Sequence, residues 1–319
     1  MEKVKYINFI ISETQLAGFV DFLRKSQSID IVSIYYMFDN SKIVDLDLNR
    51  NEARKPVQTQ DIKKAGIEPF RTNQFSRLIA KELINNEIKR IEQAIIKYHE
   101  IGIKPYIAID TNISRNGFLE AIFEKIIQNI ELWKNIKIVV PRIVIQELFQ
   151  KFSTDIFKGS KFKERGIEGF PKFESRISRY ALAIILRGMR EGICEIHGRT
   201  LLLKTGRETF GYLSDLVLID QLEEYRQLNP STHIIFVTSD FALSAISPIQ
   251  PTIYLRPVTG KMYGKISRLP EYLRYLVIVG GLIAVKTKDF ISILSYSWKG
   301  ITLEDYYNKC ICVSIPLEL

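Results

Sequence analysis

KPYIAIDTN at residues 104–112 decides the fold, together with IIFVTSD at residues 234–240. Each stretch holds a short apolar run followed by an aspartate, Asp110 in the first and Asp240 in the second. A short apolar run bounded by polar residues is typical of a strand that is buried on both faces of a parallel sheet. The sequence therefore predicts two buried strands, each with a carboxylate at or near its end.

Helices and strands alternate around these two stretches. Apolar residues recur at three- and four-residue intervals over several segments, which is the pattern of amphipathic helices. Helices are expected at 73–98, 118–133, 144–152, 176–190 and 215–227, and strands at 105–109, 136–140, 234–237 and 253–258. Strands that alternate with helices at this spacing predict a parallel, doubly wound α/β sheet.

The two ends of the chain differ in pattern from the centre. A strand, a helix and two further strands are followed by a polar stretch at 49–61, which is typical of a linker. Strand-like runs with aromatic residues follow Gly260. We therefore expect an N-terminal α+β segment with its linker at 1–72, an α/β domain led by a long helix at 73–258, and a β-rich appendage at 259–319.

The composition is that of a globular protein with a basic excess. Of 319 residues, 46% are hydrophobic and 25% are charged, and 45 Lys and Arg against 36 Asp and Glu give a net charge of +9. Such an excess suits a polyanionic partner, and nucleic acid is the partner expected here. A membrane partner is not expected, because the most apolar run, 276–285, is half the length of the ~20 residues that a membrane span needs. A homo-oligomer is left open.

Cysteine and histidine do not indicate a zinc site. The three cysteines and three histidines show neither C-x-x-C spacing nor a pair at helical ligand spacing. A bound metal would therefore be held by oxygen, which favours Mg²⁺ or Mn²⁺. The N-terminus has no signal-peptide pattern, so a cytoplasmic protein in a reducing compartment is expected.

Acidic residues stand at informative places in this pattern. Functional groups in open parallel sheets gather beyond the carboxyl ends of the strands, where Asp110 and Asp240 are predicted to lie. An Asp after a strand is also a common turn or N-cap residue, so neither aspartate indicates a site by itself.

Two further acids lie on predicted helices. At 100° per residue, Asp215 falls in the apolar stripe that contains Leu218 and Leu222, whereas Asp220 falls on the polar side. A carboxylate that faces the core needs compensation, which a bound cation or an N-cap role in the first turn would supply. Periodicity places Glu147 outside the apolar stripe of its helix, where a solvated side chain is the default expectation.

The order of these acids is similar to that of the PIN-domain nuclease family, over roughly residues 104–258. The resemblance rests on DTN at 110–112, VIQEL at 144–148, SDLVLI at 214–219 and FVTSD at 236–240. It implies four catalytic, metal-holding carboxylates, Asp110, Glu147, Asp215 and Asp240, and three auxiliary polar residues, Asn112, Thr238 and Ser239. The 67 residues between Glu147 and Asp215 (148 through 214) exceed what compact members need, so Asp220 or Glu208 is left open as the third acid.

The resemblance implies a Mg²⁺- or Mn²⁺-dependent endoribonuclease that hydrolyses phosphodiester bonds of single-stranded or structured RNA. The alternative is a catalytically inactive PIN-like scaffold that binds RNA or a protein partner. A DNA-cutting relative is left open, because metal-dependent hydrolysis does not require the 2′-OH. A phosphatase of the haloacid-dehalogenase class is disfavoured, because that class needs Asp-x-Asp and Asn112 occupies its third place.

A basic segment with interleaved phenylalanines follows the helix that carries Glu147. Such a segment could guide a single strand by phosphate contacts and stacking, or could form a solvated loop. The residues expected to bind nucleic acid are Lys158, Lys161, Lys163 and Arg165. A second basic stretch at 256–288 is the other candidate.

Overall fold

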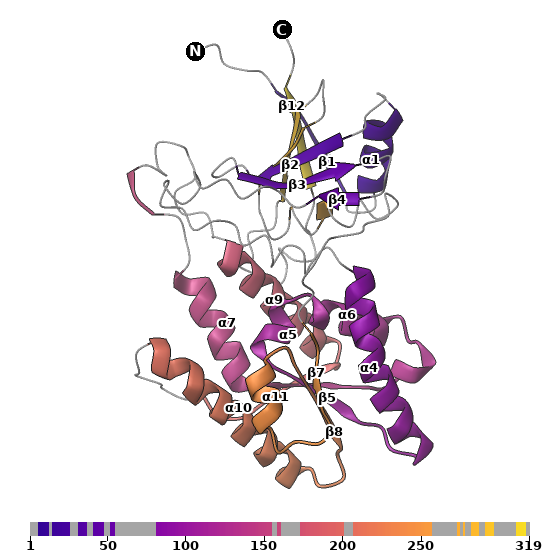
Figure 1. The fold of residues 1–319 in the computed structure, drawn as a ribbon, viewed down its shortest axis with the longest axis vertical. Coiled ribbons are helices and arrows are strands. Elements are labelled where there is room, and N and C mark those ends of the chain that lie inside the picture. The colour runs from indigo at the N-terminus through magenta and orange to yellow at the C-terminus, as the bar shows by residue number, and fades with distance from the viewer. Residues whose placement is uncertain are drawn as a thin grey trace. The chain divides into compact units, whose positions relative to one another are not determined.

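The protein is described by a computed structural model, which divides the chain into two compact units (Figure 1). The terminal unit comprises 1–80, 156–176 and 259–319, and the central unit comprises 81–155 and 177–258. The described residues are 6–12, 15–25, 31–36, 41–47, 52–54, 81–154, 158–160, 173–200, 207–256, 273–274, 277, 282–286, 291–296 and 311–316.

The terminal unit contains a seven-stranded sheet whose described strand pairs are all antiparallel. In spatial order the strands are β1 (Tyr6–Ile11), β12 (Ile311–Pro316), β11 (Ile291–Tyr296), β10 (Leu282–Lys286), β2 (Ile31–Tyr36), β3 (Ser41–Asp47) and β4 (Glu52–Arg54). The first strand of the chain thus pairs with the last, and β10 pairs with β2. Strands from the predicted segments 1–72 and 259–319 therefore share one sheet.

Side chains of the C-terminal strands build the core of the terminal unit. Ile311 and Val313 of β12 are buried with the period of two expected for a strand, whereas Ile283, Ala284 and Val285 of β10 are buried consecutively. Helix α1 (Leu16–Lys25) contributes Leu16 and Phe19 to the buried set, at the three-residue spacing of one helical face.

The central unit is built on a five-stranded parallel sheet, so the predicted α/β class with a parallel sheet is confirmed. In spatial order the strands are β7 (Cys194–His197), β6 (Ile138–Pro141), β5 (Tyr106–Ile109), β8 (Ile234–Thr238) and β9 (Thr252–Tyr254). The three inner strands β6, β5 and β8 are buried almost throughout, because helices cover both faces. Strand β7 was not predicted, because CEIH at an edge has only Cys194 fully buried.

Helices flank both faces of this sheet. They are α4 (Lys81–Glu100), α5 (Thr111–Arg115), α6 (Phe118–Ile127), α7 (Arg142–Thr154), α9 (Phe173–Arg190), α10 (Arg207–Leu228) and α11 (Phe241–Ile246). The α4 and α6 pair lies on one side and the α7 and α10 pair on the other (Figure 1). Residues 73–80 of the expected first helix and residues 257–258 of the expected last strand lie outside the described residues.

Two predicted helix boundaries were wrong. The expected helix at 118–133 ends at Ile127, because Asn129 has a left-handed backbone (φ 52°), and a short 3-10 turn, Glu131–Trp133, follows. Helix α10 begins at Arg207 and not at residue 215. Asp215 therefore lies in its third turn, where neither an N-cap role nor the helix dipole applies to it.

The order of strands creates a topological switch point at the centre of the sheet. From β5 the chain proceeds outward to β6 and β7, and it then crosses back to form β8 and β9 on the other side of β5. The chain therefore diverges at the carboxyl ends of β5 and β8, which pair through Ile109 and Val237. Such a switch point is where open α/β sheets bind their ligands.

Candidate functional site

Asp110 and Asp240 both lie at this switch point, and each caps a helix. The Asp110 Oδ1 atom accepts a hydrogen bond of 2.6 Å from the Ile113 backbone N–H at the start of α5. The Asp240 Oδ1 atom accepts one of 3.1 Å from the Leu243 N–H at the start of α11. The structural role that the sequence left open is thus present, but each cap uses only one carboxylate oxygen.

Thr238 connects the two aspartates. Its Oγ1 atom donates to the Asp110 Oδ2 atom (2.6 Å) and accepts from the Asp240 backbone N–H (2.9 Å). The Thr238 side chain is fully buried, so both bonds are shielded from water. The neighbouring Ser239 Oγ atom is also buried and has no hydrogen-bond partner among the described residues. A buried hydroxyl of this kind needs a polar partner, and a substrate, a water or an ion could provide one.

Burial controls the charge of Asp110. The side chain is 2% exposed, and this desolvation raises the pKa of Asp110 to about 7, with a further increase from the charge of Asp240. Hydrogen bonds from Thr238 and from the backbone at Ile113 and Ser239 act in the opposite direction, and burial outweighs them. A cation at this position would relieve the cost of the buried negative charge.

Glu147 is hydrogen-bonded to Thr111, the residue that directly follows Asp110. The Thr111 Oγ1 atom donates a hydrogen bond to the Glu147 Oε2 atom. Glu147 is half-buried, so the default expectation of a solvated side chain was wrong. Val144 and Leu148 are fully buried whereas Phe149 is 47% exposed, so Glu147 lies at the edge of the buried face.

Asp215 lies on the buried side of α10, as its helical phase predicted. Leu218 and Leu222 on the same side are buried, whereas Asp220 is exposed. Burial raises the pKa of Asp215 to about 6, and the negative charges of Asp240 and Glu147 contribute to the increase. Asp215 is therefore close enough to both acids for their charges to act on it.

The four predicted carboxylates thus form a chain of electrostatic neighbours. Asp110 is influenced by Asp240, and Asp215 by both Asp240 and Glu147. Within the part of the chain that the structure describes, however, no group of three or more acidic, histidine or cysteine side chains is arranged to hold a metal ion. The oxygen-only donor set fits Mg²⁺ or Mn²⁺ by chemistry, and the carboxylates would need to move closer together to share one ion.

The remaining predicted site residues lie on α5, on α10 and in the basic segment. Asn112 is exposed at the second position of α5, and Glu208 occupies the second position of α10. Lys158 is exposed, and the other three basic residues of its segment, Lys161, Lys163 and Arg165, lie outside the described residues.

Gln221 is a buried connector that the sequence reasoning missed. Its Oε1 atom accepts a hydrogen bond from the Ile143 backbone N–H (3.1 Å), and its Nε2 atom donates to the Arg199 carbonyl oxygen (3.1 Å). A Cβ atom at Gly198, whose φ is +100°, would lie 2.4 Å from the Gln221 Cδ atom, so this close approach requires glycine. Gln221 thereby joins α10 to the start of α7 and to the loop after β7.

The sequence did carry a signal for Gln221. It lies three residues after Leu218 and four before Tyr225, so helical phase places its amide on the buried face of α10. A buried amide needs partners, and backbone groups at the end of a neighbouring element commonly supply them.

Comparisons with known proteins add no family. A scan against protein-family models and a search of curated proteins both give no match. Among the described residues, no helix is long and apolar enough to cross a membrane. The geometry of the switch point and the charges gathered there are therefore the observations that bear on function.

Proposed function

We propose that the central unit is a PIN-like, Mg²⁺- or Mn²⁺-dependent ribonuclease that hydrolyses phosphodiester bonds. The observation that carries the proposal is the pairing of Asp110 and Asp240 through Thr238 at the switch point of a parallel sheet. Glu147 and Asp215 complete the proposed carboxylate set, because their charges act within the same cluster.

The carboxylates would hold the ion, and the ion would supply an activated water and charge neutralisation at the phosphoryl oxygens. The protein's own contribution is position. The two caps and the Thr238 bridge fix Asp110 and Asp240 in the same part of the site. The buried Ser239 hydroxyl is available to donate a hydrogen bond to a phosphate oxygen or to a water.

RNA is the proposed substrate, and the net charge of +9 supports a polyanionic partner. The test is incubation of the purified full chain with labelled single-stranded RNA, duplex RNA and DNA, with Mg²⁺, with Mn²⁺ or with EDTA. We expect cleavage of RNA that needs either metal and that EDTA abolishes. Preferential cleavage of DNA would correct the substrate, and the absence of metal-dependent cleavage of any substrate would contradict the proposal.

Asp110→Asn and Asp240→Asn are the decisive variants. Asparagine caps a helix as well as aspartate does, so these changes remove the charge and keep the α5 and α11 caps. We expect cleavage to fall by roughly a hundred-fold or more, since each variant loses a metal-holding oxygen of the proposed site. If either variant keeps activity within a few-fold of the wild type, the carboxylate assignment is wrong.

The second candidate function is an inactive PIN-like scaffold that binds RNA. It is favoured by the capping roles of both aspartates and by the absence, in the described residues, of three acids placed to hold an ion. A scaffold would bind RNA equally well with metal and in EDTA, and its Asp110→Asn variant would bind RNA as well as the wild type. Its melting temperature would not respond to Mn²⁺. A rise in melting temperature with Mn²⁺ that Asp110→Asn abolishes would favour the enzyme.

A further inference from the structure

Two aromatic rings lie beside the acidic cluster. Phe241 directly follows Asp240, and its side chain is 71% exposed. Its ring meets that of Tyr254 edge-on, with centroids 5.7 Å apart and planes at 81°. Tyr254 ends β9 and pairs in register with Thr238, the residue that joins the two aspartates. An exposed phenylalanine supported by a second ring offers a face on which a planar group could stack.

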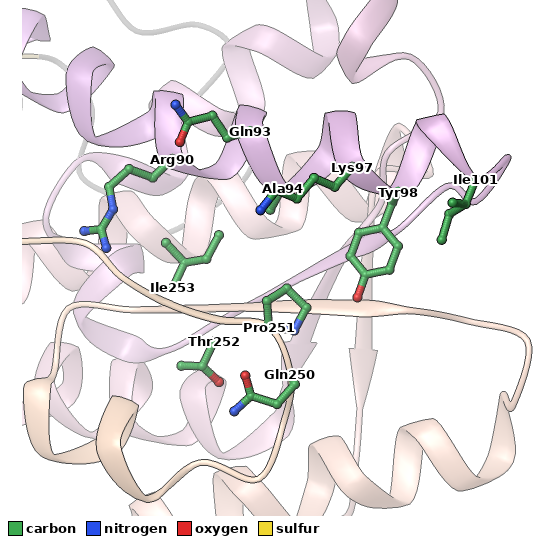
Figure 2. A pocket seen from close by; sticks show the side chains of 10 residues that line it. All are labelled: Arg90, Gln93, Ala94, Lys97, Tyr98, Ile101, Gln250, Pro251, Thr252 and Ile253. Atoms are coloured by element: carbon green, nitrogen blue, oxygen red, sulfur yellow. The ribbon is translucent and has the colours of Figure 1, made fainter.

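A cavity of about 540 Å³ lies between α4 and the segment that enters β9 (Figure 2). Its volume is within the roughly 300–1,000 Å³ range of ligand pockets. The side chains on the helix side are Arg90, Gln93, Ala94, Lys97, Tyr98 and Ile101. The opposite side is formed by residues 250–253, and no carboxylate belongs to the lining.

The cavity adjoins the aromatic pair. The Arg90 guanidinium lines the cavity and donates a hydrogen bond to the Tyr254 carbonyl oxygen. Thr252 and Ile253 line the cavity and pair with β8 residues two and one positions before Thr238. The Arg90 end of the cavity therefore lies one strand from Asp240, at the same end of the sheet as Phe241 and Tyr254, and the cavity extends from there to Gln250 and Pro251, where the chain enters β9.

The lining combines the chemical groups that a nucleotide needs. Glu87 partly neutralises Arg90 (3.4 Å), whereas Lys97 has no carboxylate partner among the described residues and is available for a phosphate. The Gln93 and Gln250 amides can both donate to and accept from the edges of a base. Figure 2 shows the Tyr98 side chain extending toward the segment that contains Pro251, which gives the cavity an apolar wall.

We propose that this cavity is a nucleotide-binding subsite, with Lys97 on the phosphate, the Gln93 and Gln250 amides on the base, and Phe241 stacking the adjacent base of a single strand. Single-stranded RNA is recognised in this way, by stacking on aromatic rings and by hydrogen bonds to base edges. The inference that the nucleotide belongs to an RNA strand rests on the proposed function. The inference that the cavity binds a nucleotide does not rest on it, because a free mononucleotide presents the same phosphate and base.

The experiment separates these two sources. The full chain is titrated in EDTA, so that no cleavage occurs, with a short labelled oligouridylate and with free uridine monophosphate. Lys97→Gln tests the cavity and Phe241→Ala tests the stacking ring. Lys104→Gln, an exposed lysine outside the cavity, and Ile246→Ala, an exposed apolar residue at the other end of α11, are the matched controls.

We expect Phe241→Ala to weaken oligouridylate binding roughly five- to hundred-fold and to leave mononucleotide binding unchanged. Lys97→Gln should weaken both ligands and reduce the salt slope of oligouridylate binding by about 0.7. If only the mononucleotide responds to Lys97→Gln, the cavity is a site for a free nucleotide, and the subsite assignment stands with that source.

The proposal is overturned if Lys97→Gln and Phe241→Ala behave like their controls, or if the wild type binds neither ligand. These results leave the cleavage assay with Asp110→Asn unaffected, because that assay depends on the carboxylates. A protein that cleaves RNA but shows no response at Lys97 and Phe241 would retain the proposed function and lose the subsite. A protein that binds through both residues but does not cleave would retain the subsite.

Discussion

Asp110 is buried among hydrogen-bond donors, and its burial gives the metal-free protein a stability contribution that depends on pH. The folded-state pKa of about 7 exceeds the ordinary value of 3.8, so the native state binds this proton more tightly than the unfolded state does. The favourable contribution is therefore fully present below about pH 4, and it is lost as pH rises through about 7. At about 1.4 kcal/mol per pKa unit, the loss is at most about 4 kcal/mol.

Asp110→Asn should remove this dependence. The asparagine Oδ1 atom can still accept from the Ile113 N–H, and its Nδ2 group can donate to the Thr238 Oγ1 atom. In EDTA, we expect the variant to gain stability relative to the wild type as pH rises from about 4 to about 8, measured by urea unfolding. A constant difference across that range would show that Asp110 is not a desolvated carboxylate. With excess Mn²⁺ at high pH, the wild type should be more stable than the variant, because the metal binds the native carboxylate.

Asp215 and Asp220 provide a matched pair on one helix. Asp215 is half-buried and is influenced by Asp240 and Glu147, whereas Asp220 is exposed. Asp215→Asn should lower metal-dependent cleavage by at least ten-fold and raise the apparent Kd for Mn²⁺, because one carboxylate of the cluster is lost. Asp220→Asn should change neither quantity by more than about two-fold. The opposite ranking would make Asp220 the third acid.

At the residue scale, the sequence predicted the helical phase of a side chain better than its hydrogen-bond partners. The inward phase of Asp215 followed from 100° per residue and did not depend on where α10 begins. The partners of Glu147 could not be predicted in the same way. Its bond to Thr111 joins residues 36 apart in the chain, and it required the correct face of α7. Thr238 was expected only as an auxiliary residue, and its role as a bridge depends on the pairing of β5 with β8.

At the scale of elements, Gln221 holds α10 against α7. Gln221→Leu would leave the Ile143 N–H and the Arg199 carbonyl without their partner, and each unsatisfied buried group costs about 1–3 kcal/mol. We expect a free energy of unfolding lower by roughly 2–4 kcal/mol and a reduced affinity for Mn²⁺, since α7 carries Glu147 and α10 carries Asp215.

Gln227→Leu, an exposed glutamine on the same helix, is the control and should be close to neutral. Urea unfolding and Mn²⁺ titration of the two variants measure both effects. Unchanged Mn²⁺ affinity in a destabilised Gln221→Leu protein would mean that the amide supports the fold without positioning the two acids.

Elements were predictable where burial was complete. Strands β5, β6 and β8 are apolar runs because both faces of the sheet are covered, and all three were expected. Strand β7 lies at an edge, where half-buried side chains follow no such pattern. The early start of α10 was missed because RETFGYL has no apolar periodicity that distinguishes it from a loop.

For the whole molecule, the charge of +9 should appear in the salt dependence of RNA binding. Replacing Lys158, Lys161, Lys163 and Arg165 with Gln should reduce the slope of log K against log salt by about 0.7 for each lost phosphate contact. Cleavage at saturating RNA should change little. Replacing Lys89, Lys104, Lys134 and Arg199 with Gln, four exposed basic residues of the central unit, is the charge-matched comparison. An equal response of both variants would assign the slope to net charge and not to this segment.

No sequence signal indicated that strands from the two ends of the chain would pair in one sheet. Each strand was recognisable by itself, but a pairing between β1 and β12 joins residues some three hundred positions apart. Local periodicity carries no information about partners at that separation, because any exposed strand edge can in principle accept another strand.

This pairing predicts what the loss of the last strand would do. Strand β12 lies between β1 and β11, so a chain ending at Cys310 removes the only described neighbour of β1. It also removes Ile311 and Val313, whose full burial contributes roughly 1.5–3 kcal/mol each. Amides of β1 and β11 should lose hydrogen-exchange protection, whereas those of β5 and β8 should keep theirs, because their parallel pairing involves no residue of β12. A chain ending at Pro316 keeps the strand and should match the wild type. Retained protection in β1 of the shorter chain would show that its pairing with β12 is wrong.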